Sequence, residues 1–126
     1  MNLEKVVFGF FILLAATLNF GFVYGDMSDP DLHEPWELFA AVAVNLIAAV
    51  LKFGDRTHIG AVHLASSLVA LLQLATATVV WVIAASVQDP VTPGAMGAIV
   101  SLSAGAFLAN IVSVVIMVVE TTMQRR

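Results

Sequence analysis

Four uncharged amide side chains interrupt the long apolar runs of this sequence. They are Asn19, Asn45, Gln73 and Asn110, one in each of four apolar segments. An amide donates and accepts hydrogen bonds but carries no charge. Inside a membrane, such groups either join helices by hydrogen bonds or line a path for a polar solute. We expect the first role, because neutral amides commonly join helices in lipid.

His63 is a further polar residue that invites a chemical role, since histidine can carry a proton or bind a metal. No second ligand lies at metal-like spacing, whereas Ser66 and Ser67 follow at three and four residues, within reach on a helix. We therefore expect His63 to bond to a hydroxyl or carbonyl group. The chain has no cysteine, no nucleotide-binding or hydrolase motif and no metalloprotease motif. We expect no enzyme, no catalytic residue, no cofactor and no metal.

Small side chains recur every four residues in the last apolar segment. They are Gly97, Ser101, Gly105, Ala109 and Ser113, and a shorter version in the first segment contains Gly21 and Gly25. Small residues at this spacing let another helix approach closely. Five of them exceed what one short crossing needs, so the stripe fits a neighbouring helix of the same chain and a partner subunit equally well.

The composition indicates lipid as the natural solvent of the chain. Of its 126 residues, 60% are hydrophobic and 11% are charged, whereas a soluble domain is about 45–50% apolar and about 25% charged. A small domain lacks the interior volume to hide this excess. The formal net charge is −4, and no basic stripe exists to contact phosphates, so we expect no nucleic-acid partner.

The apolar runs predict an all-α protein with four transmembrane helices, at about residues 6–25, 36–53, 59–87 and 94–119 of a single membrane domain, 1–126. Each run approaches or exceeds the roughly 20 residues that cross a bilayer. The runs do not alternate polar and apolar residues, which excludes barrel strands. The first run lacks a cleavage site and is long for a signal peptide, so we expect a retained helix.

The charges predict how the chain threads the membrane. All the basic residues fall at the two ends of the chain and in the second loop: Lys5, Lys52, Arg56, Arg125 and Arg126. Four spans place these regions on one side, which the positive-inside rule makes cytoplasmic. We expect an up-down-up-down bundle with both termini in the cytoplasm.

The acidic loop from Asp26 to Glu34 either attracts cations or caps helices, and we expect capping.

The opening segment Met1–Phe11 and the segment Asn45–Thr57 resemble a family of small bacterial inner-membrane proteins, classified only as a domain of unknown function. The stretch Leu51–Thr57 is the most specific part of this resemblance, which covers essentially the whole chain. The resemblance implies a location in the bacterial inner membrane. It implies no activity and no functional residues.

Small loops, spans without embedded charge and the small-residue stripe together favour a protein that acts through helix–helix association. We expect an accessory or assembly subunit of a larger membrane complex, with an ion channel or transporter as a possible host. The alternative is a homo-oligomeric pore or small-solute carrier lined by the intramembrane amides. The expected partners are the lipid bilayer and either a second copy or another integral membrane protein.

Overall fold

Each apolar run forms one α-helix in the computed structural model, which describes residues 3–25, 29–54, 57–87 and 91–124. The helices are α1 (Leu3–Val23), α2 (Pro35–Lys52), α3 (His58–Val87) and α4 (Pro93–Gln124). The fully buried positions of α4 include Met96, Ile99, Ser103, Ala106, Asn110 and Ser113. This alternation of three and four residues keeps one face of a helix toward its neighbours, as in helical bundles.

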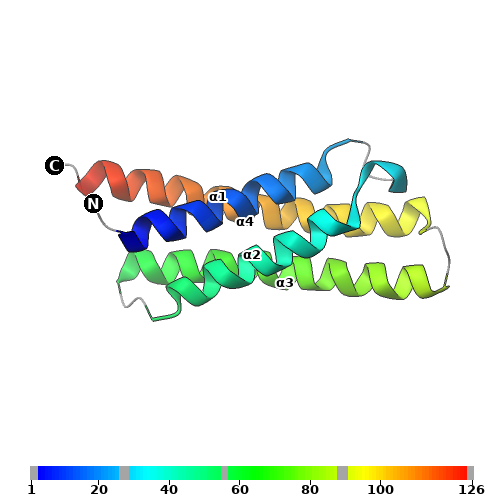
Figure 1. Ribbon diagram of the computed structural model, residues 1–126, viewed down its shortest axis with the longest axis horizontal. Helices are drawn as coiled ribbons and strands as arrows, with labels where there is room; N and C mark the ends of the chain where they lie inside the picture. Colours follow the sequence, from blue (N-terminus) through cyan, green and yellow to red (C-terminus); the bar gives the residue numbers. More distant parts are fainter. Residues whose placement is uncertain (1–2, 26–28, 55–56, 88–90, 125–126) are drawn as a thin grey trace.

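The helices run up and down in turn, and both ends of the chain lie at the same end of the bundle (Figure 1). The main contacts join α1 to α2, α2 to α3, α3 to α4 and α4 to α1, so each helix packs against two neighbours. This confirms the predicted four-helix, up-down-up-down architecture. The predicted boundaries hold within three residues, except that α4 continues to Gln124.

All four helices are long and apolar enough to cross a membrane, so the chain is a multi-pass membrane protein. α3 has 30 residues and α4 has 32. At 1.5 Å per residue they measure about 45 and 48 Å, whereas the hydrocarbon core of a bilayer is about 30 Å thick. Both helices must therefore tilt or extend beyond the lipid core.

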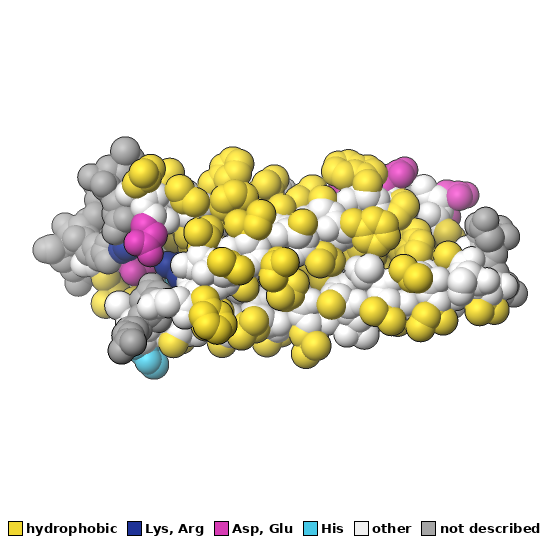
Figure 2. All heavy atoms as spheres, turned by 60° about the horizontal axis from the view of Figure 1, so that its bottom comes forward, with side chains coloured by type: hydrophobic (Ala, Val, Ile, Leu, Met, Phe, Trp, Pro, Cys, Tyr) yellow, Lys and Arg dark blue, Asp and Glu magenta, His cyan; other side chains and the backbone are white. Residues whose placement is uncertain are grey.

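The surface of the bundle is apolar between two charged ends (Figure 2). We call the end with both termini, which carries Lys5 and Lys52, the basic end. The opposite end, with the acidic residues that precede and begin α2, is the acidic end. Arg56, Arg125 and Arg126, on which the predicted orientation also rests, lie outside the described residues.

The described residues between α1 and α2 contact one another and the end of α1 at the acidic end. Gly25 adopts a positive φ of 101° just after α1, a conformation that glycine adopts without a steric penalty. The backbone N–H of Asp31 donates to the Asp29 carboxylate at 3.0 Å at the start of the short 3-10 helix η1 (Pro30–Leu32). The imidazole of His33 is buried and hydrogen-bonds to the Phe22 carbonyl. The predicted capping role is confirmed for Asp29, while Asp26 lies outside the described residues.

Candidate functional site

Three of the four amides lie in the interior of the bundle. Asn19, Asn45 and Asn110 occupy buried positions of α1, α2 and α4 and have no exposed side-chain surface. Contacts between helices show which residues lie at the same level along the bundle axis. Phe20 of α1 contacts Phe107 of α4, and Lys52 of α2 lies over the Phe8 ring of α1. By this register, the three asparagines fall within about 10 Å of one another along the bundle axis.

Most polar side-chain atoms of these asparagines have no hydrogen-bond partner among the described residues. Asn45 donates from Nδ2 to the Ala41 carbonyl at 2.8 Å, within its own helix. The Asn45 Oδ1 atom and both polar side-chain atoms of Asn19 and Asn110 have no hydrogen-bond partner among the described residues. The Ser67 hydroxyl, also fully buried, has none there either. A buried polar group left in this way costs roughly 1–3 kcal/mol, and such groups commonly bind internal water or a ligand.

The fourth amide, Gln73, lies at the seam between α3 and α4 rather than at a fully buried interior position. Its side chain occupies the space beside Gly105: a Cβ atom built on that glycine would lie 2.6 Å from Gln73 Oε1 and 2.8 Å from Nε2. Real Cβ atoms essentially never come this close to another atom. Gly105 therefore makes room for a side chain of its own bundle.

The small-residue stripe of α4 does not keep to one face. Each step of four residues advances about 40° around a helix, so the stripe winds around α4. At the acidic end, Ser101 is exposed and open space lies beside Gly97. Toward the basic end, Ala109 packs against the core, and the buried Ser113 hydroxyl bonds to that of Ser66 in α3. Only the first part of the stripe remains open to a partner.

The two glycines of the shorter stripe also have local roles. A Cβ atom on Gly21 would collide with the carboxylate of Glu37, so this glycine makes room for an acidic side chain of α2. Gly25 is exposed and lies beyond the end of α1. Its positive φ ends the helix instead of packing against another one.

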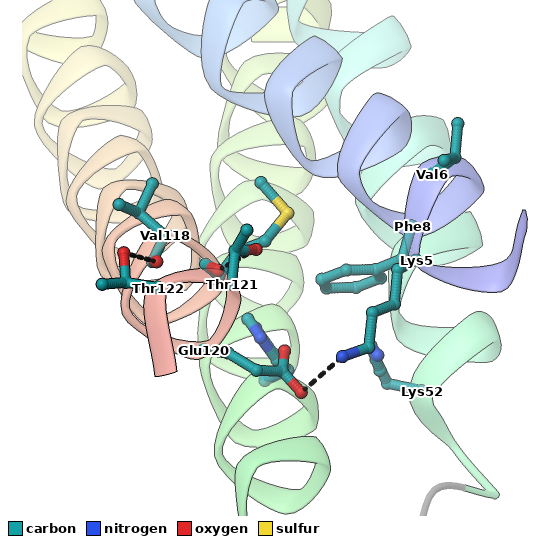
Figure 3. A pocket seen from close by; sticks show the side chains of 10 residues that line it. Lys5, Val6, Phe8, Lys52, Val118, Glu120, Thr121 and Thr122 are labelled. Atoms are coloured by element: carbon teal, nitrogen blue, oxygen red, sulfur yellow. Dashed lines mark hydrogen bonds and ion pairs between the residues drawn. The ribbon is translucent and has the colours of Figure 1, made fainter. Parts of the chain in front are cut away.

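A cavity of about 370 Å³ opens at the basic end, where all four helices contribute side chains. The charged side chains of Lys5 and Lys52 enter it from α1 and α2, and Glu120 meets Lys5 from α4 at 3.2 Å (Figure 3). Lys52 as a whole residue is only 7% exposed, and its ammonium lies 4.4 Å from the centre of the Phe8 ring. This arrangement suits a cation, because the face of an aromatic ring attracts positive charge.

His63 links this cavity to the polar interior. Its ring lines the cavity and lies edge-on to Phe8, with ring centres 4.9 Å apart. The Ser66 hydroxyl donates to the main-chain carbonyl of His63 at 3.1 Å. Ser67 follows one turn deeper on the same buried face of α3. A series of polar groups thus leads from the cavity toward the three asparagines.

The described residues at the acidic end of the bundle form a packed apolar cluster. Phe22 lies between the rings of His33 and Trp81, at centre distances of 5.5 and 5.9 Å. Leu38 and Met96, both fully buried, belong to the same cluster. Among the described residues, the interior is therefore polar in the middle, hollowed at the basic end and packed with apolar side chains at the acidic end.

Sequence analysis did not find the basic-end cavity. A signal for it exists, since Lys52 follows Asn45 by seven residues and so shares its helix face. Ser103 was missed as well, and Ser67 was named only as a neighbour of His63, because serine is common on every face of a membrane helix. Their buried positions emerge only when the four helices are packed together.

Comparison with known proteins gives the family of the chain. No curated protein and no solved structure matches it. A family model described as a family of unknown function, DUF6394, matches residues 32–121. The match includes α2, α3 and most of α4, while the opening segment and α1 lie outside it. Because more than two thirds of the sequence is covered, the chain belongs to the DUF6394 family of unknown function.

Proposed function

We propose that this chain is a carrier of the bacterial inner membrane that passes a small polar solute through the interior of its own bundle. The observation that carries the proposal is the set of buried asparagine atoms without partners among the described residues. A bilayer protein that only needed stable packing would gain by replacing such groups with apolar ones. Polar groups retained inside the membrane commonly mark substrate paths.

The placement of the asparagines favours a carrier over a pore between subunits. A pore formed by several copies needs polar side chains on the outer faces of its helices. Asn19, Asn45 and Asn110 are instead buried inside one bundle. An open basic end, with described residues of the acidic end in a packed apolar cluster, resembles one state of a carrier that gives access to one side at a time. No charged side chain of the described residues lies among the asparagines, which fits an uncharged or weakly charged solute. We propose no enzymatic step.

The proposal is tested with purified protein in liposomes. Flux of urea, glycerol and small ions is followed by stopped-flow light scattering and by ion-sensitive dyes. We expect the wild-type chain to conduct at least one small solute. The Asn110→Leu variant replaces two unpartnered polar atoms with methyl groups and keeps the same branching of the side chain. It should lower that flux at least tenfold while leaving the protein as stable as before, or more stable.

The control variant is Thr76→Val. Thr76 is exposed, and its hydroxyl bonds to the Leu72 carbonyl of its own helix, at 2.8 Å. This change also removes one polar group but should leave flux unchanged. Wild-type liposomes silent toward every solute, or an Asn110→Leu variant that conducts normally, would refute the carrier.

A second candidate function is the accessory or assembly subunit of a larger membrane complex. The observation that favours it is the open part of the small-residue stripe, where Ser101 is exposed and a Cβ atom on the half-buried Gly97 would meet no other atom within 4 Å. Another helix can approach α4 closely there. Under this proposal the partner is another integral membrane protein or a second copy. The two functions differ in a simple respect: a carrier works alone in liposomes, and a subunit does not.

A further inference from the structure

A second cavity lies on the outside of the bundle, in the seam between α1 and α4. It measures about 320 Å³, and its lining is apolar except for one threonine: Leu13, Ala16, Thr17, Phe20, Phe107, Ile111 and Val114. Several of these side chains are exposed on the apolar belt of the surface. The cavity therefore faces the hydrocarbon of the membrane.

This groove and the basic-end cavity lie along the same seam. On α4, the seam residues are Phe107, Ile111 and Val114 in the groove, then Val118 and Thr121 in the basic-end cavity. Their spacings of four, three, four and three residues place them on one face of the helix. On α1, Val6 and Leu13 are seven residues apart and likewise share a face. The charged cavity thus continues into an apolar groove along the same pair of helices.

The part of the seam between the two cavities is formed by Gly9 and Met117, and the methionine side chain can change its conformation. A Cβ atom on Gly9 of α1 would lie 3.1 Å from the sulfur of Met117 on α4. Gly9 has no side chain, so the flexible thioether of Met117 occupies the space between α1 and α4 at this point. Methionine adapts its shape more readily than branched side chains do. A long flexible ligand can therefore pass from one cavity to the other at small cost.

The charges at the basic end suit an anionic group. Among the described residues, the cavity holds two lysines, Lys5 and Lys52, against one carboxylate, Glu120. The remaining titratable group is His63. With the histidine neutral, the formal charge of this lining is +1. Basic pockets between transmembrane helices bind the phosphate of acidic lipid head groups.

We propose that the α1/α4 seam binds one anionic phospholipid from the leaflet that faces the basic end. The lipid phosphate lies near Lys5 and Lys52, and one acyl chain lies in the groove. From Lys5 to Thr17 the helix rises about 18 Å, slightly more than the roughly 15 Å depth of one leaflet of the hydrocarbon core. The seam therefore has the polarity and the length of a lipid that stands in its own leaflet.

A helix from a second copy is a poorer occupant of the seam. An apolar helix lying in the groove would run on toward Lys5 and Lys52, and Glu4, in the first turn of α1, is the one exposed carboxylate that the described helices offer at that end. A phospholipid matches both parts at once, because it joins a negative phosphate to an apolar chain. The lipid phosphate shares the basic-end cavity with the mouth of the polar interior, but lipid retention is measured separately from solute flux.

Native mass spectrometry tests the proposal on the full chain in a mild detergent. Phosphatidylglycerol and phosphatidylcholine with identical acyl chains are added at equal concentration. We expect one retained phosphatidylglycerol per chain, with at least a tenfold preference over phosphatidylcholine. The Lys5→Gln variant should reduce that preference by about fivefold, the usual contribution of one basic residue near an anionic lipid.

The groove is tested by a matched pair of neighbouring residues. Val114→Trp places a large ring in the groove and should reduce phosphatidylglycerol retention at least tenfold. Val115 is exposed and outside the groove, so Val115→Trp should leave retention unchanged. Thermal unfolding of both variants shows whether each remains folded. If Val114→Trp unfolds, Val114→Phe replaces it, with Val115→Phe as its control.

Three results would overturn the lipid site. Equal retention of the two lipids would remove the role of the lysines. Equal stabilisation by inorganic phosphate and by phosphatidylglycerol would remove the role of the acyl chain. A loss of dimer mass in the Val114 variant, with lipid retention unchanged, would assign the groove to a second copy.

Discussion

At the scale of single residues, the contact between Gly105 and Gln73 makes a sharp prediction about stability. The Gly105→Leu variant places a branched side chain where even a Cβ atom lies 2.6 Å from the Gln73 amide. Gln73 or the whole of α4 must then move, and such overpacking costs about 1–3 kcal/mol. We expect a lower midpoint of thermal unfolding for the purified variant in detergent, measured by circular dichroism.

The control is the same substitution two helical turns earlier. Gly97→Leu adds an identical side chain where a Cβ atom meets open space. We expect the unfolding midpoint to stay near the wild-type value, as for other surface substitutions, within about 0.5 kcal/mol. Equal losses from both variants would mean that Gly105 is no more tightly packed than Gly97.

The identity of the polar residues could be predicted from the sequence, but their surroundings could not. Asn19 and Gln73 both stand out in apolar runs, and nothing in either run says that one is fully buried while the other lies in a seam. The deciding facts are the neighbouring helix and its small residues. Those come from long-range packing, which a local pattern does not contain.

At the scale of helices, the existence and approximate ends of α1 to α4 followed from hydropathy alone, because lipid admits few alternatives to a helix. The buried face of each helix was harder to predict. In a soluble bundle the exposed face is polar and reveals the buried one. Here the lipid-facing and interior faces are both apolar. The small residues at every fourth position of α4 therefore did not identify its buried face. They wind around the helix, whereas the buried face passes through Ser103 and Asn110.

The open part of that stripe carries a prediction for the accessory-subunit function. Gly97→Leu fills the space that a partner helix needs beside α4, so it should release the partner and reduce the mass of the particle extracted in mild detergent. The control is Ala98→Leu, an exposed neighbour outside the stripe, which should leave the particle intact. A particle whose mass is the same in wild type and in the Gly97→Leu variant excludes this part of α4 as the contact.

At the scale of the whole molecule, both described lysines lie at one end of the bundle, together with Glu4 and Glu120, and the other described acidic residues lie at the opposite end. Lys5 and Lys52 stand at the end with both termini, while Asp29, Asp31 and Glu34 stand at the other. Such a difference orients a membrane protein during insertion, since basic loops stay in the cytoplasm. The structure fixes which segments share an end, and the charges predict which side of the membrane that end faces.

The absence of cysteine from the chain makes this orientation directly measurable, because a single introduced thiol is the only one to react. Asp31 at the acidic end and Gly54 at the basic end are both exposed, and a Cβ atom at Gly54 meets no other atom within 4 Å. In intact spheroplasts, Asp31→Cys should react with a membrane-impermeant maleimide, and Gly54→Cys should react only after lysis. Both variants should react equally in detergent, which controls for intrinsic reactivity. The opposite pattern would place the two termini outside the cell, and with them the lysines and the mouth of the polar interior.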